Sequence, residues 1–400
     1  MKDLNKSRED FKILNKDNAP IYFDSSCMSL KPNQVVEAMD DYYYNFPACA
    51  GRSSHKMGDK VTTKIKEVRE LTQKFINAKS EKEIIFTRNT TEGINLLANG
   101  FSFQKGDAVL ITDREHNSNL VPWLVLRDKI GIEVRVVPSR EDNTFDLEKY
   151  TEMVQGVKLV SMVYTSNLDG VTIPAKEIIE IAHKNNALVF LDAAQAMPHR
   201  KVDVRDLDVD FLAFSGHKML GPTGTGVFYG KENLLEKLAP FMVGGDTVEY
   251  TTYTDYKMLE LPEKFEAGLQ DYAGIIGLGE AIKYLNNLDY TEIQKHEFVL
   301  NKYITDEMSK LPQIKIIGPK DPSLRSGIIN FYIENIDMHK FALMLDNMAN
   351  ISIRSGQHCV HSYFESRKIK NSARVSLYFY NTLEETETFI NNLNKIIKII

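Results

Sequence analysis

The chain has 400 residues, a formal net charge of −6, and 43% hydrophobic and 26% charged residues. This composition is typical of a folded globular protein and excludes a chain that is disordered throughout. A negative net charge gives no general attraction to nucleic acid or anionic lipid, and no stretch reaches the roughly 18 apolar residues that cross a membrane, so neither is expected as a partner. The charged N-terminus lacks the apolar run of a signal peptide, and we therefore expect a cytoplasmic location.

Short apolar runs rich in β-formers alternate with helical patterns over the first part of the chain. Continuous runs of this kind are typical of strands whose two faces are both covered by helices. The pattern predicts an α/β sheet, whose ligands bind outside the carboxyl ends of the strands. The seven predicted strands are EIIFT (83–87), DAVLIT (107–112), EVRVVP (133–138), VKLVSMVY (157–164), ALVFLD (187–192), VDFLAFS (209–215) and GVFYG (226–230).

The pattern changes after about residue 260, where long amphipathic helices precede spaced strands. Because 400 residues exceed what one hydrophobic core usually supports, we expect two domains. We predict a large α/β domain over residues 20–265 and a smaller α+β domain over 1–19 and 266–400. In the second part we predict helices at 271–288 and 291–311, strands at 327–333, 351–355 and 373–380, and a closing helix at 383–398.

The three cysteines, Cys27, Cys49 and Cys359, are far apart in the sequence. They show neither CxxC spacing nor a combined Cys/His ligand spacing. The sequence therefore predicts neither a disulfide framework nor a metal site, although one cysteine can still be reactive.

Lys218 lies in SGHKMLGPTGTG (215–226), directly after a predicted strand and therefore at a ligand-binding edge of the sheet. A lysine desolvated in such a place has a lowered pKa and is a good Schiff-base partner for an aldehyde cofactor. A solvated loop lysine is the alternative. The glycine run lacks the Gly-Lys-Ser/Thr ending of a nucleoside-triphosphate loop, so we reject nucleotide binding.

Asp192 ends the predicted strand ALVFLD, at the same edge of the sheet. A carboxylate there can keep a pyridine nitrogen protonated, which lets the ring act as an electron sink. The alternative role is a helix N-cap. Gln195, in the same block, is placed to reach the phenolic oxygen of such a ring.

Together, LDAAQA and SGHKMLGPTG resemble the cofactor site of class V pyridoxal-phosphate enzymes of fold type I. The resemblance extends from IYFDSSCMSLKP to RVSLYFYNT, across almost the whole chain. It implies a large domain with a mostly parallel seven-stranded sheet, a smaller α+β C-terminal domain, and a homodimer with active sites at the interface. It also implies pyridoxal 5′-phosphate as the cofactor, attached to Lys218 and paired with Asp192.

Other blocks of the family occur in the same order. In FTRNTTEGINLLA, Thr90 and Thr91 open a helix whose free N–H groups favour the cofactor phosphate, although they are also simply a good helix start. His116 corresponds to a histidine that stacks on the ring and moves protons; a lone histidine is more often structural. The resemblance further places Asn167 near the ring hydroxyl, and Ser215 and His217 in the phosphate cradle.

The segment ISIRSGQHCVHSYF (351–364) resembles the catalytic cysteine segment of SufS-type, or group II, cysteine desulfurases. Cys359 occupies the cysteine position, among neighbours whose polar and partly cationic character favours a thiolate. A small buried hydrophobe is the usual alternative for a free cysteine. Arg354, in the same segment, is expected to help bind the substrate.

Arg374, in ARVSLYFYNT, resembles the arginine that grips the substrate α-carboxylate, for which a guanidinium fork is suited. An arginine that opens a strand is otherwise usually a surface residue. The short interval between Cys359 and Arg374 favours the SufS type over the NifS/IscS type.

The sequence departs from the family at two places. Gly268-Leu269 stands where the family usually has Gly-Thr, a threonine that reaches the cofactor phosphate of the partner subunit; only a backbone N–H or Gln270 is available to substitute. CAGRSSHKMG (49–58) also differs in detail from the family, although Arg52 and His55 remain at plausible active-site positions.

The resemblance implies a cysteine desulfurase that converts L-cysteine to L-alanine with a persulfide on Cys359, and that supplies sulfur for iron–sulfur clusters or other pathways. The implied acceptor is a SufE- or SufU-like protein or an iron–sulfur scaffold. Another class V activity, such as selenocysteine lyase, aminotransferase or kynureninase-like lyase, would use Lys218 and Asp192 without Cys359. A noncatalytic sulfur carrier is the third alternative, and the joint presence of these residues with His116 argues against it.

Overall fold

The structure, a computed structural model, describes residues 4–399. Its largest sheet has seven strands in the order β2-β8-β7-β6-β5-β3-β4. Only β8 runs against the others, so the expected mostly parallel sheet is confirmed. The strands match the seven predicted runs: β2 (Ile84–Thr87), β3 (Ala108–Thr112), β4 (Glu133–Val137), β5 (Val157–Val163), β6 (Leu188–Asp192), β7 (Phe211–Ser215) and β8 (Gly226–Gly230).

Both faces of this sheet are buried, which explains the continuous apolar runs. Leu110 belongs to one hydrophobic cluster, and its neighbours Val109 and Ile111 belong to a second cluster on the opposite face. The first cluster is completed by side chains from α3 (Lys56–Phe75), α6 (Leu147–Met153), α7 (Ala175–Lys184) and α10 (Tyr272–Asn286). The second is completed by α4 (Thr90–Gly100), α5 (Val121–Ile130) and α9 (Glu232–Leu235).

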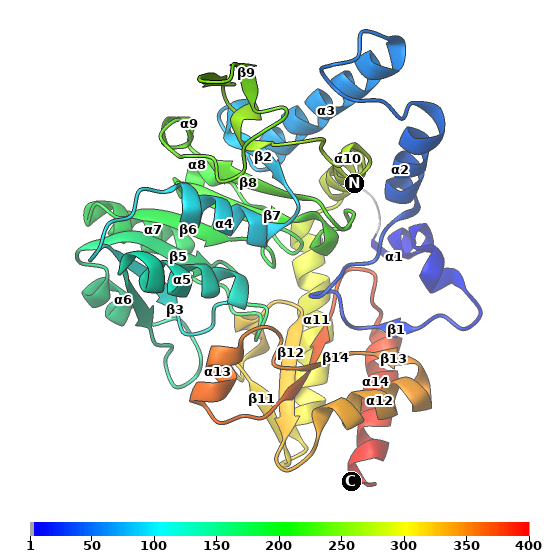
Figure 1. The fold of residues 1–400 in the computed structure, drawn as a ribbon. Coiled ribbons are helices and arrows are strands. Elements are labelled where there is room, and N and C mark those ends of the chain that lie inside the picture. The colour runs from blue at the N-terminus through cyan, green and yellow to red at the C-terminus, as the bar shows by residue number, and fades with distance from the viewer. Residues whose placement is uncertain (1–3, 400) are drawn as a thin grey trace.

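A second, antiparallel sheet has the order β11-β12-β15-β14. Its apolar face packs with the flanking helices in a separate cluster that contains Phe331 and Val375. Figure 1 shows α11 running from the side of the large sheet into this part of the molecule. The elements are α11 (Tyr290–Ser309), β11 (Ile314–Ile317), β12 (Ile328–Ile333), α12 (Met338–Ala349), β14 (Arg354–Gly356), α13 (His361–Ser366), β15 (Ser372–Ser376) and α14 (Leu383–Ile397).

The three predicted C-terminal helices and the strand at 327–333 occur close to their expected positions, but two other strands were predicted too long. The run 351–355 divides into β13 (Ile351–Ser352), which pairs with β1 (Ile21–Tyr22), and β14, which joins the second sheet. The run 373–380 ends at Ser376, because the aromatic residues that follow leave the sheet. Tyr378 and Tyr380 are buried in the first hydrophobic cluster.

The remaining elements connect these layers. A hairpin of β9 (Val248–Thr251) and β10 (Tyr256–Met258) was not predicted from the sequence. The other helices are α1 (Leu4–Ser7), α2 (Asn33–Asn45) and α8 (Val204–Leu207), with 3₁₀ turns at Arg8–Asp10, Lys12–Asn15, Glu81–Glu83, Asn117–Asn119, Gly216–Lys218, Glu263–Phe265 and Pro322–Leu324.

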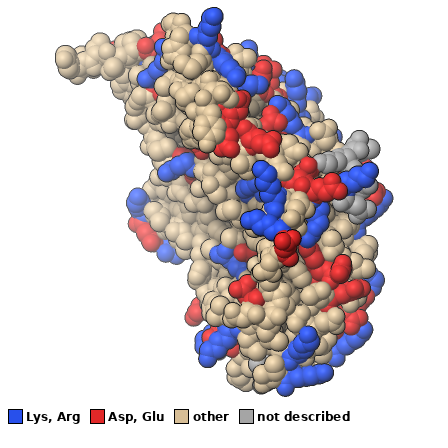
Figure 2. All heavy atoms as spheres, turned by 90° about the vertical axis from the view of Figure 1, so that its right-hand side faces the viewer, with Lys and Arg blue, Asp and Glu red and all other residues tan. Residues whose placement is uncertain are grey.

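Surface charge is mixed in sign. Figure 2 shows Lys and Arg interspersed with Asp and Glu on the face that it presents. Across the described part of the chain, no helix has the length and apolar character needed to cross a bilayer.

Candidate active site

A cavity lies at the edge of the large sheet where the parallel strands end. Twelve site residues singled out in the sequence line it: Thr90, Thr91, His116, Asn167, Asp192, Gln195, Ser215, His217, Lys218, Arg354, Cys359 and Arg374. The strand order produces this gathering, because β2, β3, β5, β6 and β7 all point their carboxyl ends to this edge. The sequence did not single out Ser26, Cys27, Asn89, Ser118, Val163, Ala194 and His358, which also line the cavity.

Asp192 ends β6, Lys218 follows the adjacent strand β7, and the two side chains interact electrostatically. Burial lowers the pKa of Lys218, while Asp192 opposes that shift; burial likewise raises the pKa of Asp192, and Lys218 opposes it. The Asp192 carboxylate accepts the Ala194 N–H at 3.0 Å. The chain after Asp192 forms turns, so Asp192 does not cap a helix.

The N-terminus of α4 meets the end of β7 at one side of the cavity. Ser215 Oγ accepts the Thr90 N–H at 2.9 Å and lies 2.7 Å from Thr90 Oγ1. Thr91 Oγ1 lies 2.7 Å from Ser118 Oγ. Burial lowers the pKa of His217 to about 4, so its ring is neutral near pH 7. Hydroxyl groups and a helix N-terminus therefore meet where an anion is favoured.

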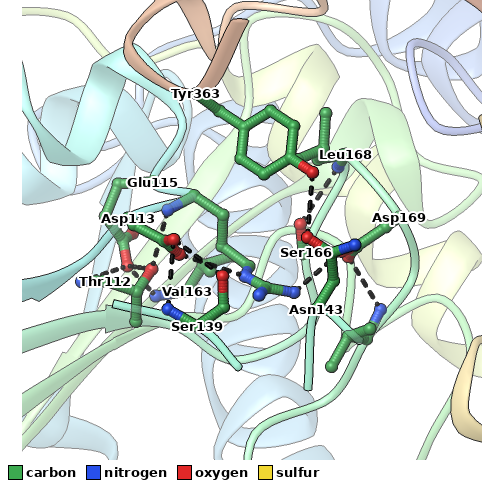
Figure 3. Close-up of polar contacts among 12 residues, drawn as sticks. Thr112, Asp113, Glu115, Ser139, Asn143, Val163, Ser166, Leu168, Asp169 and Tyr363 are labelled. Carbon is green, nitrogen blue, oxygen red and sulfur yellow. Dashed lines mark hydrogen bonds and ion pairs between the residues drawn. The ribbon is translucent and has the colours of Figure 1, made fainter. Parts of the chain in front are cut away.

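His116 is a neutral imidazole with an assignable tautomer. Its Nδ1 accepts the Ser118 N–H at 3.1 Å, which leaves Nε2 to carry the proton. Burial, reinforced by the charge of Lys218, lowers the pKa of His116 to about 3. The preceding residue, Glu115, is also buried, and its Oε1 accepts hydrogen bonds from Thr112 Oγ1 at 2.6 Å and Val163 N–H at 3.0 Å (Figure 3).

Polar contacts join the His116 turn to neighbouring loops. Figure 3 shows Asp113 bonded to Ser139, and Tyr363 bonded to Asn143. Arg114, between Asp113 and Glu115, donates to Asp169 at 2.7 Å in a buried ion pair. Because Tyr363 belongs to α13, which follows Cys359, its bond joins the segment after Cys359 to the loop that contains Asn143.

Cys359 lies on a tight turn in which both His358 and Cys359 have left-handed backbones, with φ of 50° and 59°. Asn167 Nδ2 donates to the His358 carbonyl at 2.8 Å, and the Asn117 N–H donates to the Cys359 carbonyl at 2.7 Å. Such a conformation persists only when its surroundings hold it. Burial holds the pKa of His358, which directly precedes Cys359, well below its ordinary value.

Arg374 is buried in the middle of the second sheet, with 2% of its surface exposed, so the surface alternative for this residue is wrong. It donates to the Asn167 carbonyl at 2.9 Å, and its Nη2 lies 3.4 Å from Asp24. Arg354 Nη1 lies 2.6 Å from Cys27 Sγ. Two guanidinium groups thus line one cavity, and Arg374 keeps a buried Nε without a partner.

Four further buried polar atoms of the cavity residues lack a hydrogen-bond partner: Ser26 Oγ, Asn167 Oδ1, Gln195 Oε1 and His358 Nδ1. Leaving such groups unpaired costs free energy. The cavity is therefore built to receive a polar group.

The residues that depart from the family pattern lie outside the cavity. Leu269 is 68% exposed, and the Gln270 side chain donates to the carbonyls of Ala267 and Gly268 in its own loop. Arg52 pairs with Asp246, and His55 caps the start of α3.

The sequence model of the class V aminotransferases matches residues 21–389. The chain belongs to the class V aminotransferase family. A probable cysteine desulfurase of Halalkalibacterium halodurans is 40% identical over 379 residues, which are 94% of this chain and 92% of that protein.

Two solved structures are also similar to this chain over its whole length. The apo cysteine desulfurase of Thermococcus onnurineus NA1 has a TM-score of 0.96 and 35% identity, and the match covers 100% of this chain and 99% of that one. The cysteine desulfurase CsdA of Escherichia coli has a TM-score of 0.93 and 29% identity, with 100% of both chains covered.

Proposed function

We propose that this protein is a pyridoxal-phosphate-dependent cysteine desulfurase of the SufS type, which converts L-cysteine to L-alanine. The observation that carries this proposal is that Cys359 lines the same cavity as Lys218 and Arg374. A thiol, an amine and a carboxylate-binding guanidinium are the three groups that the reaction needs. The relatives named cysteine desulfurase support it.

The residues of the cavity fit pyridoxal phosphate. Lys218 has the desolvated amine that attaches an aldehyde, and Asp192 is the carboxylate for a pyridine nitrogen. Ser215 and the N-terminus of α4 would hold the phosphate, with Thr90, Thr91 and His217 beside them. The unpartnered oxygens of Asn167 and Gln195 supply acceptors for the remaining polar groups.

When bound, the cofactor supplies an electron sink for the bond between the substrate Cα and its proton. Arg374 orients cysteine through its carboxylate, with Arg354 beside it. The Lys218 amine would take the Cα proton of the substrate and return it during turnover. His116, a neutral imidazole that lines the cavity, would help to hold and orient the cofactor.

Sulfur transfer belongs to Cys359. Its thiolate attacks the substrate sulfur, so that an S–S bond forms as the substrate Cβ–S bond breaks. The electron pair of the broken bond stays with the carbon fragment, which takes up protons and leaves as alanine. The product on the protein is a persulfide at Cys359, ready for transfer to an external thiol.

The location of the enzyme, its domains, its subunits and its sulfur acceptor are part of the same proposal. We place the enzyme in the cytoplasm as a homodimer, with residues 20–265 as the cofactor domain and residues 1–19 and 266–400 as the domain that carries Cys359. Exposed apolar side chains near the hairpin, Tyr253 and Leu269, support a subunit contact there. The acceptor would be a SufE- or SufU-like protein or a scaffold for iron–sulfur clusters.

The test is an assay of alanine and sulfide from L-cysteine, with and without a thiol reductant. The proposal predicts that alanine forms in both cases, stops after about one equivalent per site without reductant, and continues with it. A Cys359→Ser variant distinguishes the class V alternatives: a lyase or aminotransferase that does not need this thiol would turn over undiminished. A preparation that never binds pyridoxal phosphate would leave only a noncatalytic carrier.

A further inference from the structure

The carbonyl oxygen of His217, the residue before Lys218, receives hydrogen bonds from three donors in the N-terminal segment. The Ser29 N–H donates at 3.0 Å, Ser29 Oγ at 3.1 Å and Lys31 Nζ at 3.1 Å. Ser29 Oγ also accepts the Leu220 N–H at 2.8 Å. Residues 29 and 31 thus hold the turn that carries Lys218 from both of its ends.

This turn has a backbone that needs support. Leu220 has a φ of 68°, in the left-handed region that a branched side chain rarely adopts. The Leu220 N–H is the group that Ser29 binds. Ser29 therefore binds the turn at Leu220, the residue with the unfavourable left-handed backbone.

The other end of the same segment is fixed to the strand that carries Arg374. The Ser376 N–H donates to the Phe23 carbonyl at 2.7 Å, and Ser376 Oγ accepts the Ser26 N–H at 3.0 Å. The Asp24 carboxylate lies 3.4 Å from Arg374 Nη2. Residues 23–31 therefore connect the predicted carboxylate-binding arginine to the predicted cofactor lysine.

Lys31 is an unusual residue to place in this connection. Burial lowers its pKa to about 7, and among residues 4–399 no carboxylate pairs with it. Its amino group donates instead to the carbonyls of Ser29 and His217. A desolvated cation has a free-energy cost, which hydrogen bonds to these carbonyls offset.

We propose that Ser29 and Lys31 are positioning residues that fix the Lys218 turn relative to Arg374. The substrate carboxylate bound at Arg374 sets the place of Cα, and the segment sets the place of the Lys218 amine that must reach it. This assignment of roles rests on the proposed function. Whether Ser29 and Lys31 stabilise the Lys218 turn can be tested without any catalysis.

The first experiment is amide hydrogen exchange on the cofactor-free protein, comparing wild type with Lys31→Met, Ser29→Ala and the exposed-site control Lys16→Met. Losing a hydrogen bond to the His217 carbonyl predicts about tenfold faster exchange in peptides covering 25–31 and 216–221 for the first two variants. Exchange in β3 and β5 should stay as in wild type, and Lys16→Met should match wild type throughout. Unchanged exchange at 216–221, or equal acceleration across the whole sheet, overturns the proposal.

The second experiment measures kcat and KM for cysteine in the holoenzyme. Lys31→Met should lower kcat about tenfold and leave KM within about twofold, because Arg374 keeps its own contacts while proton transfer at Cα loses its geometry. Lys31→Arg, which retains a cationic donor, should recover part of kcat. A raised KM with unchanged kcat contradicts the positioning role. Absence of alanine from wild type would refute the desulfurase proposal and leave the exchange result standing.

Discussion

The backbone N–H of Asn117 donates to the carbonyl oxygen of Cys359 at 2.7 Å. Asn117 directly follows His116, so this bond ties the histidine turn after β3 to the left-handed turn that carries the cysteine. A second bond, between Asn117 Nδ2 and His361 Nδ1 at 2.8 Å, repeats the connection through side chains. The turns that carry His116 and Cys359 are therefore held as one unit, and disturbing either turn should displace the other.

Lys218→Ala should abolish covalent attachment of pyridoxal phosphate and reduce turnover to below about one-hundredth, the usual contribution of a positioned base. Borohydride reduction of wild type followed by peptide mapping should find the cofactor on the peptide that contains Lys218. Lys201→Ala, an exposed lysine outside the cavity, is the matched control. Label on a different lysine would reject the site assignment.

Asp192→Asn should retain bound cofactor and lose most of the activity. The amide can still form a hydrogen bond to the pyridine nitrogen, but it cannot keep that nitrogen protonated. Cofactor content is measured by absorbance and turnover by alanine release. Turnover near that of wild type would mean that Asp192 has only a structural role in its turn.

Glu115 should make folding stability depend on pH. Burial raises its pKa from 4.5 to about 7, so the folded protein keeps this proton at pH values where the unfolded chain has lost it. The resulting stabilisation is present below the unfolded pKa and is lost as pH rises through about 7.

Denaturant unfolding at pH 5 and pH 8 measures this effect against Glu115→Gln, which has no charge to bury. Relative to that variant, wild type should lose about 3 kcal/mol of unfolding free energy between the two pH values. The exposed Glu141→Gln serves as control and should follow wild type. Parallel pH dependences of wild type and Glu115→Gln would show that Glu115 is already ionised in the fold.

Arg374→Lys should raise KM for cysteine by about ten- to a hundredfold, the effect of losing one charge-assisted hydrogen bond, with a smaller change in kcat. A lysine ammonium cannot offer the two parallel N–H groups that match a carboxylate. Steady-state kinetics of alanine formation provide the measurement, with the exposed Arg127→Lys as control. An unchanged KM would place the carboxylate elsewhere, with Arg354 as the next candidate.

The seven strands of the large sheet could be predicted because burial on both faces leaves continuous apolar runs such as VKLVSMVY. The end of β15 could not be predicted from the sequence. The run from Leu377 to Tyr380 looks like a continued strand, and only the three-dimensional packing of Tyr378 against His199 and Phe379 shows why it turns away. The β9–β10 hairpin has short strands whose residues are mainly exposed, so no continuous apolar run marks it.

The cavity could be predicted where a residue ends a strand or belongs to a family block, as Asp192 and Lys218 do. Cys27 was missed as a lining residue because its neighbour in the site, Arg354, is distant in sequence. The neutral state of His358 also depends on burial that no local pattern reveals. Likewise, the link between Lys31 and the carbonyl of His217 joins segments that only the fold brings together.

The central claim is that Cys359 accepts the substrate sulfur, and mass spectrometry of the wild-type holoenzyme after incubation with cysteine alone tests it most directly. All three cysteines are free thiols, so an added sulfur on any of them can be detected. We predict one added sulfur on the peptide that contains Cys359, none on those with Cys27 or Cys49, and none anywhere in Cys359→Ser, while Cys49→Ser behaves as wild type. An added sulfur on a different cysteine, or undiminished sulfide release by Cys359→Ser, would contradict the account.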